Sequence, residues 1–597
     1  MKSIKINQEP QEVSQLFEGR NNFAVIGLTG RTGSGCTTAA NILESEPTFP
    51  THHDARSGGE PLYSGLSTKR YNIVKNFASK NWDRFFSIKV SDLISAYILQ
   101  INIGDLVNFI CESADPQAVD RAKVENLLRD KDGAYQEAVR KLAKYEHFSK
   151  YIINRDMALT GESKNGKGLK HYMLLVRDFT SKFKKDLINL NADLYILVYQ
   201  SAGNSIRRTG AVICEYEKEE FKAEMVFHLP ESINRIIKLI RRSRSRAFIV
   251  IDAIRNPHEA RFFKDRYSAF YLMSINAPNA DRQEYLTAHH KFNKEQVDNI
   301  DKVESGDWLK DKDEAREYGD KSKSERSWIS QNVKKCIEMS DIHVFNPRNE
   351  LPNNNVLKAQ LAWYVSLIKH PGLISPTPME RVMQIAYTAK ANSGCISRQV
   401  GAVITNNDQS IKAIGWNDVA EGQYPCALRS VDGALNEFDS EIYSEFERSD
   451  NNFRDSLKIA HKNILDNPEI LSGRNCSYCF KDIKNSADKK GNQVHTRSLH
   501  AEENAFLQIT KYGGQPIQGG KLYTTASPCE LCSKKAYQLG VEEIIFIDPY
   551  PGIAKEHILA IGRKPPKLIQ FRGAVGKAYH MLYEPVIAYK DELEFFR

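Results

Sequence analysis

The sequence His500-Ala-Glu502, followed after 25 residues by Pro528-Cys-Glu-Leu-Cys532, decides the fold of the C-terminal part of the chain. Zinc in a catalytic site is held by three protein ligands and keeps one position open for water. Cys529 and Cys532 are three residues apart, so they share one face of a helix that begins near Pro528. A helix N-terminus also favours thiolates. The spacing therefore predicts a zinc site in which His500 supplies the third ligand from a neighbouring helix.

Glu502 gives this site a second chemical group. It follows His500 by two residues and is not needed as a zinc ligand. A carboxylate here can take a proton from a zinc-bound water and pass it to a ring nitrogen and then to departing ammonia, while hydroxide attacks C4 of a cytosine. The H-x-E…P-C-x-x-C arrangement is typical of zinc-dependent nucleobase deaminases. The alternative interpretation is a purely structural zinc site, which has no need for a carboxylate at this position.

The sequence from about Met379 to Tyr550 resembles the cytidine deaminase superfamily and, more narrowly, the deoxycytidylate deaminases. The resemblance is carried by residues 383–386, 398–404, 415–417, 500–504 and 524–532. It implies a mixed five-stranded sheet between helices and a catalytic Zn²⁺. It also implies that Asn417 contacts the sugar of the substrate, that Tyr550 lies near the base, and that Arg398 contacts a phosphate. An ordinary surface charge is the alternative interpretation of Arg398.

A second metal site is suggested by Cys476-Ser-Tyr-Cys479, with Cys426 upstream and His495 downstream. Three cysteines and one histidine suit a closed, tetrahedral structural zinc site. A metal would order such a loop without a large core. The alternative is that these are free cytosolic thiols.

A glycine-rich turn lies near the other end of the chain. The apolar run 23–30 is followed by Arg31-Thr-Gly-Ser-Gly-Cys-Thr-Thr38 and then by a helix-compatible segment. The pattern matches the phosphate-binding loop G-x-x-x-x-G-K-[ST] except that Cys36 replaces the lysine. Loop N–H groups at a helix N-terminus can still hold an anion, and Thr37 can still hold Mg²⁺. We expect nucleotide binding without efficient phosphoryl transfer, by Gly30, Gly33, Ser34, Gly35, Cys36, Thr37 and Thr38; a tight strand–helix turn is the alternative.

Two further stretches resemble a nucleoside monophosphate kinase-like fold. Residues 200–208 follow a run at 194–199 that we interpret as a strand, and Phe248–Asp252 resembles a Walker B strand that ends in its aspartate. The runs 247–251 and 269–275 suit buried parallel strands. Residues of helical pattern fill most of 60–190, and the charge-dense segment 296–328 predicts a solvated helix or a lid.

The predicted fold class is α/β throughout. A P-loop NTPase-like domain with a parallel sheet and a helical insertion comes first, and an α/β/α cytidine deaminase-like domain follows. Proline, asparagine and glycine are frequent around residues 346–378. We therefore expect a nucleotide-binding regulatory domain over residues 1–350, a linker over 351–375 and a zinc-dependent deaminase domain over 376–597.

Composition limits the classes that remain. The chain has 597 residues, a formal net charge of +8 and 10 cysteines. No apolar run approaches the ~20 residues that span a bilayer, and the N-terminus has no secretory signal, so we expect a cytoplasmic protein with no membrane partner. The mild positive charge fits a compact anion such as a nucleotide.

A degenerate P-loop domain in front of a deoxycytidylate deaminase resembles one group of bacterial anti-phage enzymes. That resemblance implies conversion of dCTP and dCMP to dUTP and dUMP with release of ammonia, a homo-oligomer, and restraint by a small non-coding RNA in uninfected cells. Two other functions stay open. One is deamination of cytosine or adenine within RNA or single-stranded DNA, and the other is a nucleotide kinase or nucleotide-sensing regulatory protein.

Overall fold

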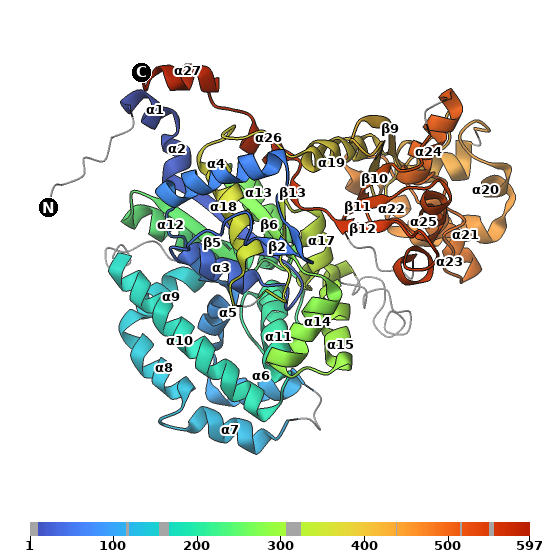
Figure 1. Ribbon diagram of the computed structural model, residues 1–597. Coiled ribbons are helices and arrows are strands. Elements are labelled where there is room, and N and C mark those ends of the chain that lie inside the picture. The colour runs from blue at the N-terminus through green and yellow to red at the C-terminus, as the bar shows by residue number, and fades with distance from the viewer. Residues whose placement is uncertain are drawn as a thin grey trace. The chain divides into compact units, whose positions relative to one another are not determined.

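The computed structural model describes residues 10–114, 119–154, 166–305, 324–350, 352–437, 439–513, 516–548 and 554–597 (Figure 1). The chain divides into two compact units. Unit 1 comprises residues 1–375 and 577–597, and unit 2 comprises residues 376–576. Within the described parts of both units, no helix has the length and apolar character needed to cross a membrane.

Unit 1 is built on a sheet of parallel strands in the order β7-β6-β1-β5-β4. Strands β5 and β6 flank the central strand β1. Every residue of both is buried, which explains their continuous apolar sequences. The strands predicted near residues 23, 247 and 269 are confirmed. Their bounds are β1 (Phe23–Thr29), β4 (Phe86–Lys89), β5 (Ala247–Asp252), β6 (Phe270–Asn276) and β7 (Ile342–Phe345).

The strand predicted at residues 194–199 is wrong. These residues begin helix α11 (Leu194–Thr209), which also contains the stretch 200–208. Leu194, Val198, Ala202 and Ile206 are fully buried and recur every four residues, which is the spacing of one helix face. A short apolar run alone does not distinguish a strand from a buried helix.

The predicted helical insertion is present and lies between β4 and β5 (Figure 1). Apolar side chains from its helices pack into one cluster that continues to the sheet. Its helices are α5 (Val90–Ile98), α6 (Ile103–Glu112), α7 (Arg121–Arg129), α8 (Ala134–Leu142), α9 (Glu146–Ile153), α10 (Gly166–Leu190), α11 and α12 (His228–Ser243).

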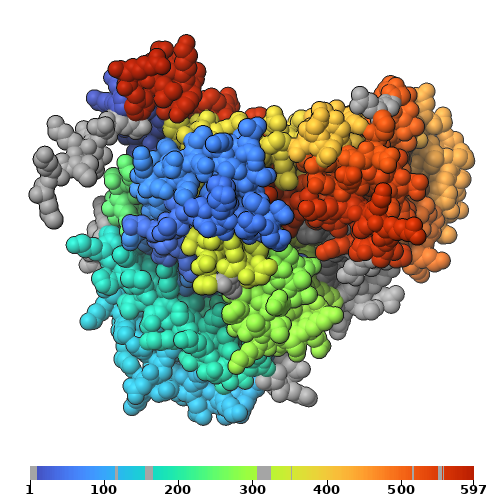
Figure 2. Space-filling view, in the orientation of Figure 1, coloured from blue at the N-terminus to red at the C-terminus, as the bar shows by residue number. Residues whose placement is uncertain are grey.

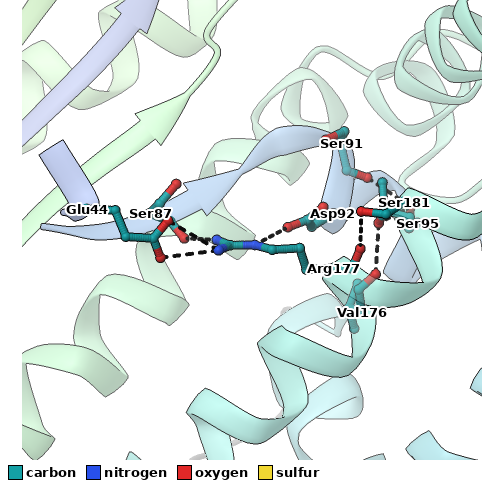
Figure 3. A network of polar contacts seen from close by, with 9 residues as sticks. Glu44, Ser87, Ser91, Asp92, Ser95, Val176, Arg177 and Ser181 are labelled. Atoms are coloured by element: carbon teal, nitrogen blue, oxygen red, sulfur yellow. Dashed lines mark hydrogen bonds and ion pairs between the residues drawn. The ribbon is translucent and has the colours of Figure 1, made fainter. Parts of the chain in front are cut away.

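Arg177 in α10 fastens this insertion to the sheet (Figure 3). Its Nη2 donates to the carbonyl of Ser87 in β4 at 3.0 Å, and its Nη1 pairs with Glu44 at 3.2 Å. Its Nε pairs with Asp92 of α5 at 3.3 Å. Burial raises the pKa of the Asp92 carboxyl, and the positive charge of Arg177 opposes that rise. One guanidinium therefore joins three separate elements.

We expect Arg177→Ala to lower the free energy of unfolding of unit 1 by about 2–3 kcal/mol, because it leaves the Asp92 carboxylate buried without its partner. Urea denaturation followed by tryptophan fluorescence measures the change. Arg84→Ala is the control, since Arg84 and its partner Glu46 are both largely exposed and such pairs contribute about 0–1 kcal/mol. Equal stabilities of the two variants would contradict the proposed role of the network.

Unit 2 contains the predicted mixed sheet, in the order β12-β11-β10-β8-β9. Strand β8 is antiparallel to both of its neighbours, whereas β10, β11 and β12 are parallel to one another. The bounds are β8 (Gly401–Thr405), β9 (Ile411–Trp416), β10 (Lys521–Ala526), β11 (Glu543–Asp548) and β12 (Lys567–Gln570).

Successive residues of each strand point to opposite faces of this sheet, and both faces are covered by helices. Ile404 and Leu522 belong to one apolar cluster, together with residues of α24 (Ala501–Tyr512) and α25 (Glu530–Gln538). Val403 and Tyr523 belong to another, together with residues of α19 (Pro378–Ala389). The helices α24 and α25 begin where the sequence predicted helices, beside His500 and Pro528, and α19 covers the other face of the sheet, so the unit has three layers.

The expected linker and C-terminal boundary differ from the structure. Residues 355–369 form helix α18, whose side chains are almost all buried in unit 1. The last segment, with α26 (Lys577–Tyr583) and α27 (Tyr589–Glu594), also belongs to unit 1. His370 donates to or accepts from Glu592 at 2.8 Å, which helps to hold this tail. Asparagine and proline mark the ends of α18, not a flexible connection.

Candidate active site

His500, Cys529 and Cys532 converge on one point in unit 2. His500 immediately precedes α24, and Cys529 immediately precedes α25, so both lie at helix N-termini. The Nδ1 atom of His500 is 3.3 Å from Sγ of Cys529 and 3.4 Å from Sγ of Cys532. Ligands at ordinary Zn–N and Zn–S distances in a tetrahedron would be about 3.6 Å apart. The three predicted ligands therefore fit a zinc ion, and in the described part of the chain no other three His, Cys, Asp or Glu side chains gather closely enough to do so.

The two thiols differ strongly in acidity. Cys532 donates a hydrogen bond to Cys529, which lowers the pKa of Cys529 to about 3, and the nearby imidazole of His500 adds to this effect. The same shared proton raises the pKa of Cys532. Zinc binding requires deprotonated cysteines, so the metal would take the place of this proton.

Glu502 lies in the first turn of α24 and is buried. Its Oε1 accepts a hydrogen bond from the hydroxyl of Thr524, in β10, at 3.1 Å. Burial raises the pKa of the Glu502 carboxyl. A carboxyl with a raised pKa can both accept and return a proton near neutral pH, which a general acid–base must do.

Two contacts that the sequence did not predict hold the two helices in place. An ion pair between Lys535 and Glu503 joins α25 to α24. The amide nitrogen of Asn504 donates to the carbonyl of Trp416 at 3.0 Å and fixes α24 on β9. Asn504 stands within the motif that was quoted for its resemblance, but nothing in the sequence indicates its partner.

Gly415 allows α24 to approach β9 closely. A Cβ atom at this position would lie 2.3 Å from the carbonyl oxygen of Ala501 and 2.6 Å from the backbone nitrogen of Ala505. Both obstacles are backbone atoms of the helix that carries Glu502, so neither can turn aside. The glycine is thus required by packing.

We expect Gly415→Ala to lower the stability of unit 2 by about 1–3 kcal/mol, the usual effect of overpacking a buried site. It should also lower zinc occupancy, because α24 must shift. Thermal denaturation and metal analysis measure the two effects. Gly491→Ala is the matched control, because a Cβ there would meet no atom within 4 Å. A zinc content and melting temperature like those of the control would contradict the packing argument.

The candidate substrate residues have structural partners. The Asn417 side chain accepts from the backbone of Val400 and donates to the carbonyl of Arg398, both at 2.7 Å. Arg398 itself pairs with the buried Asp548 at 2.6 Å. The structure thus connects these two residues to each other near β8. Tyr550 lies outside the described residues.

The structure does not assemble the predicted second zinc site. Cys426, Cys476, Cys479 and His495 contribute no group of three ligand atoms within 4.8 Å of one another. The imidazole of His495 lies 3.9 Å from the Asp488 carboxylate. Cys479 precedes helix α23 (Phe480–Asp488), and burial raises its pKa to about 11.

The glycine loop of unit 1 connects β1 to helix α3 (Cys36–Glu44). Gly33 and Gly35 have positive φ angles of 85° and 106°, which glycine adopts without strain. The hydroxyl of Thr37 donates to Asp252 at the end of β5. Burial raises the pKa of Cys36 to about 12, so its thiol is neutral. The predicted loop residues and Asp252 are thus brought together, but without the cation that a lysine would supply.

Comparisons with known proteins agree on the C-terminal part of the chain. Residues 376–548 match the family model of the cytidine and deoxycytidylate deaminase zinc-binding region. The deoxycytidylate deaminase of Enterobacteria phage T2 is 29% identical over 171 residues, which are 28% of this chain and 79% of the phage protein. That of phage T4 is 29% identical over 171 residues, 28% of this chain and 77% of the phage protein.

A solved structure of the dCMP deaminase from cyanophage S-TIM5, in complex with dCMP and dUMP, is 22% identical. The match covers 33% of this chain and 99% of that protein, with a TM-score of 0.20. By sequence, the C-terminal part of the chain therefore contains a domain similar to the zinc-binding region of the cytidine and deoxycytidylate deaminases.

Proposed function

We propose that this protein hydrolyses the exocyclic amine of free deoxycytidine nucleotides, dCMP and dCTP, to give dUMP and dUTP with release of ammonia. One observation carries the proposal: the buried carboxyl of Glu502 lies beside His500, Cys529 and Cys532, and it hydrogen-bonds with Cys532. A structural zinc site has no use for such a group. The phage relatives that match the C-terminal part are named as deoxycytidylate deaminases.

The residues of the site would divide the chemistry as follows. His500, Cys529 and Cys532 would hold a zinc ion, which supplies an acidified water at neutral pH. The Glu502 carboxylate accepts a proton from the attacking water and gives it to N3 of the cytosine, and a second transfer protonates the departing amine. The hydroxyl of Thr524 donates to Oε1 of Glu502 and so orients this carboxyl.

We further propose that unit 1 binds a nucleotide and controls the deaminase without phosphorylating a substrate. The parallel sheet, the loop at residues 30–38 and the contact of Thr37 with Asp252 support binding of a nucleotide with Mg²⁺. Cys36 in place of the lysine argues against phosphoryl transfer. Depletion of deoxycytidine nucleotides during phage infection, restraint by a small RNA and a homo-oligomeric state belong to the proposal by resemblance only.

Substrate profiling tests the proposal. We expect the purified chain to release ammonia and a uracil product from dCMP, dCTP or both, since the domain resembles deaminases of free nucleotides. CTP and a cytosine-containing RNA or single-stranded DNA oligomer complete the panel. Turnover of an oligomer without turnover of any free nucleotide would replace this function with base editing in nucleic acid. Robust ATP-dependent phosphorylation of a nucleotide by the Glu502→Ala chain would refute the regulatory role of unit 1.

A further inference from the structure

Buried polar atoms without a hydrogen-bond partner gather around the glycine loop of unit 1. Such atoms are rare in proteins, and each one calls for an explanation such as an absent ligand. Four of those found in the described residues lie in side chains that surround this loop: Arg282 Nε, Asp301 Oδ1, Asn346 Oδ1 and Arg348 Nε.

Two of these side chains, those of Asn346 and Arg348, lie close to the start of α3. An added Cβ at Gly35 would lie 2.2 Å from Nδ2 of Asn346 and 2.8 Å from Nη1 of Arg348. Arg348 is only 5% exposed, and its Nη1 reaches the hydroxyl of Thr38 at 3.4 Å. A buried cation therefore faces a helix N-terminus, where anions bind favourably.

Three more arginines lie on the outer side of the same loop: Arg31 within it, and Arg255 and Arg282, which both contact Thr32. Arg282 is fully buried and donates to the carbonyl of Thr32 at 3.0 Å. Arg255, three residues after Asp252, donates to the hydroxyl of Thr32 at 3.1 Å. With Arg31 itself, these side chains restore the positive charge that the loop lacks at Cys36.

Carboxylates of helix α15 (Lys294–Ser305) already occupy these groups. Glu304 is 1% exposed, and its Oε2 accepts the backbone N–H of Thr32 at 2.9 Å. Its Oε1 accepts from the Thr32 hydroxyl and from Arg255. One turn earlier, Asp301 pairs with Arg31 at 2.5 Å and with Arg282. A loop N–H, a hydroxyl and guanidinium groups are also the donors that proteins offer to a phosphate.

We infer that Thr32, Arg31, Arg255 and Arg282 form a binding site for the terminal phosphate of a nucleoside triphosphate, and that the Glu304 carboxylate occupies this site as an internal competitor. The inference rests on the proposed binding of a nucleotide by loop 30–38. Binding of the phosphate then requires α15 to withdraw. Nucleotide binding in unit 1 is thereby converted into movement of a helix.

The packing of α15 suits such a movement. Val297 and Ile300 bury it in a small apolar cluster with Leu286 and Phe292, separate from the main core. The helix pair α14 (Asn279–His290) and α15 lies at the surface of unit 1, in light green in Figure 2. Elements with few buried apolar contacts open at low free energy.

Binding of MgATP and of inorganic tripolyphosphate to the full chain tests the inference, since neither offers a cytosine to the deaminase site. We expect Glu304→Gln to bind both at least about tenfold more tightly than the wild type, because a competitor that keeps the site closed reduces affinity by the fraction of open molecules. Asp298→Asn is the matched control, since Asp298 is an exposed carboxylate on the same helix. Adding Arg255→Gln to Glu304→Gln should abolish the gain.

Hydrogen exchange on the wild type gives a second measurement that needs no variant. Saturating MgATP or tripolyphosphate should increase amide exchange in residues 294–305 and protect residues 31–38. Equal affinity of Glu304→Gln, Asp298→Asn and wild type would overturn the role of Glu304 while leaving nucleotide binding intact. Absence of binding to every variant would overturn both this inference and the nucleotide-binding proposal, whereas deamination of dCMP in the same samples reports on unit 2 alone. Unchanged exchange in α15 upon saturation would also overturn the inference.

Discussion

We expect replacement of Glu502 by alanine to lower the rate of the proposed dCMP and dCTP deamination by at least about 10²-fold, and by as much as about 10⁴-fold, while the zinc content stays unchanged. The carboxyl is the proposed acid–base of the site, is buried and lies in the first turn of α24, yet it is not among the three candidate zinc ligands. Loss of the Glu502 carboxyl therefore removes proton transfer but leaves the three metal ligands unchanged. Release of ammonia measures the rate, and metal analysis of the same samples measures zinc.

Glu469→Ala is the control for this experiment, because Glu469 is an exposed carboxylate of unit 2 in a short helical turn. Its activity should equal that of the wild type. Glu502→Gln should resemble Glu502→Ala in rate, because the amide keeps the size of the side chain but carries no transferable proton. A Glu502→Ala protein that retains full zinc and more than about a tenth of the wild-type rate would sink the assigned role.

The three candidate zinc ligands could be predicted from the sequence because metal binding constrains residue types and spacing together. His500, Cys529 and Cys532 lie within short motifs, and each motif coincides with the start of a helix. The mixed five-stranded sheet of unit 2 was expected from the resemblance to the deaminase family, and the structure contains it. Local pattern and tertiary position agree there.

Elsewhere the local pattern was insufficient. Residues 194–199 were interpreted as a strand because this run is apolar or aromatic at every position, whereas the spacing that marks the helix becomes visible only over the whole of α11. The spacing of Cys426, Cys476 and Cys479 resembles a metal-binding motif. Their side chains and that of His495 nevertheless bring no three ligand atoms close together. The pairing of Glu304 with Thr32 joins residues 272 positions apart, and no sequence rule predicts such a contact.

The second large effect concerns the metal. Cys529→Ser should reduce zinc from about one ion per chain to a small fraction of that, and deamination should fall below detection. The pKa of the Cys529 thiol is lowered to about 3, so the site is prepared to bind a cation with a thiolate that serine cannot replace. Removal of zinc from the wild type with a chelator should give the same loss, and added zinc should restore activity in the wild type only.

Two further cysteine variants separate this effect from a general loss of thiols. Cys214 lies in unit 1, away from any triad of ligands among the described residues, so Cys214→Ser should keep both zinc and activity. Cys476→Ser decides the number of metal sites. No three ligand atoms of Cys426, Cys476, Cys479 and His495 lie within 4.8 Å of one another. We therefore expect Cys476→Ser to retain the wild-type zinc content. A wild type with two zinc ions per chain, one of which is lost in Cys476→Ser, would show that a metal draws Cys426, Cys479 and His495 together from the positions described here.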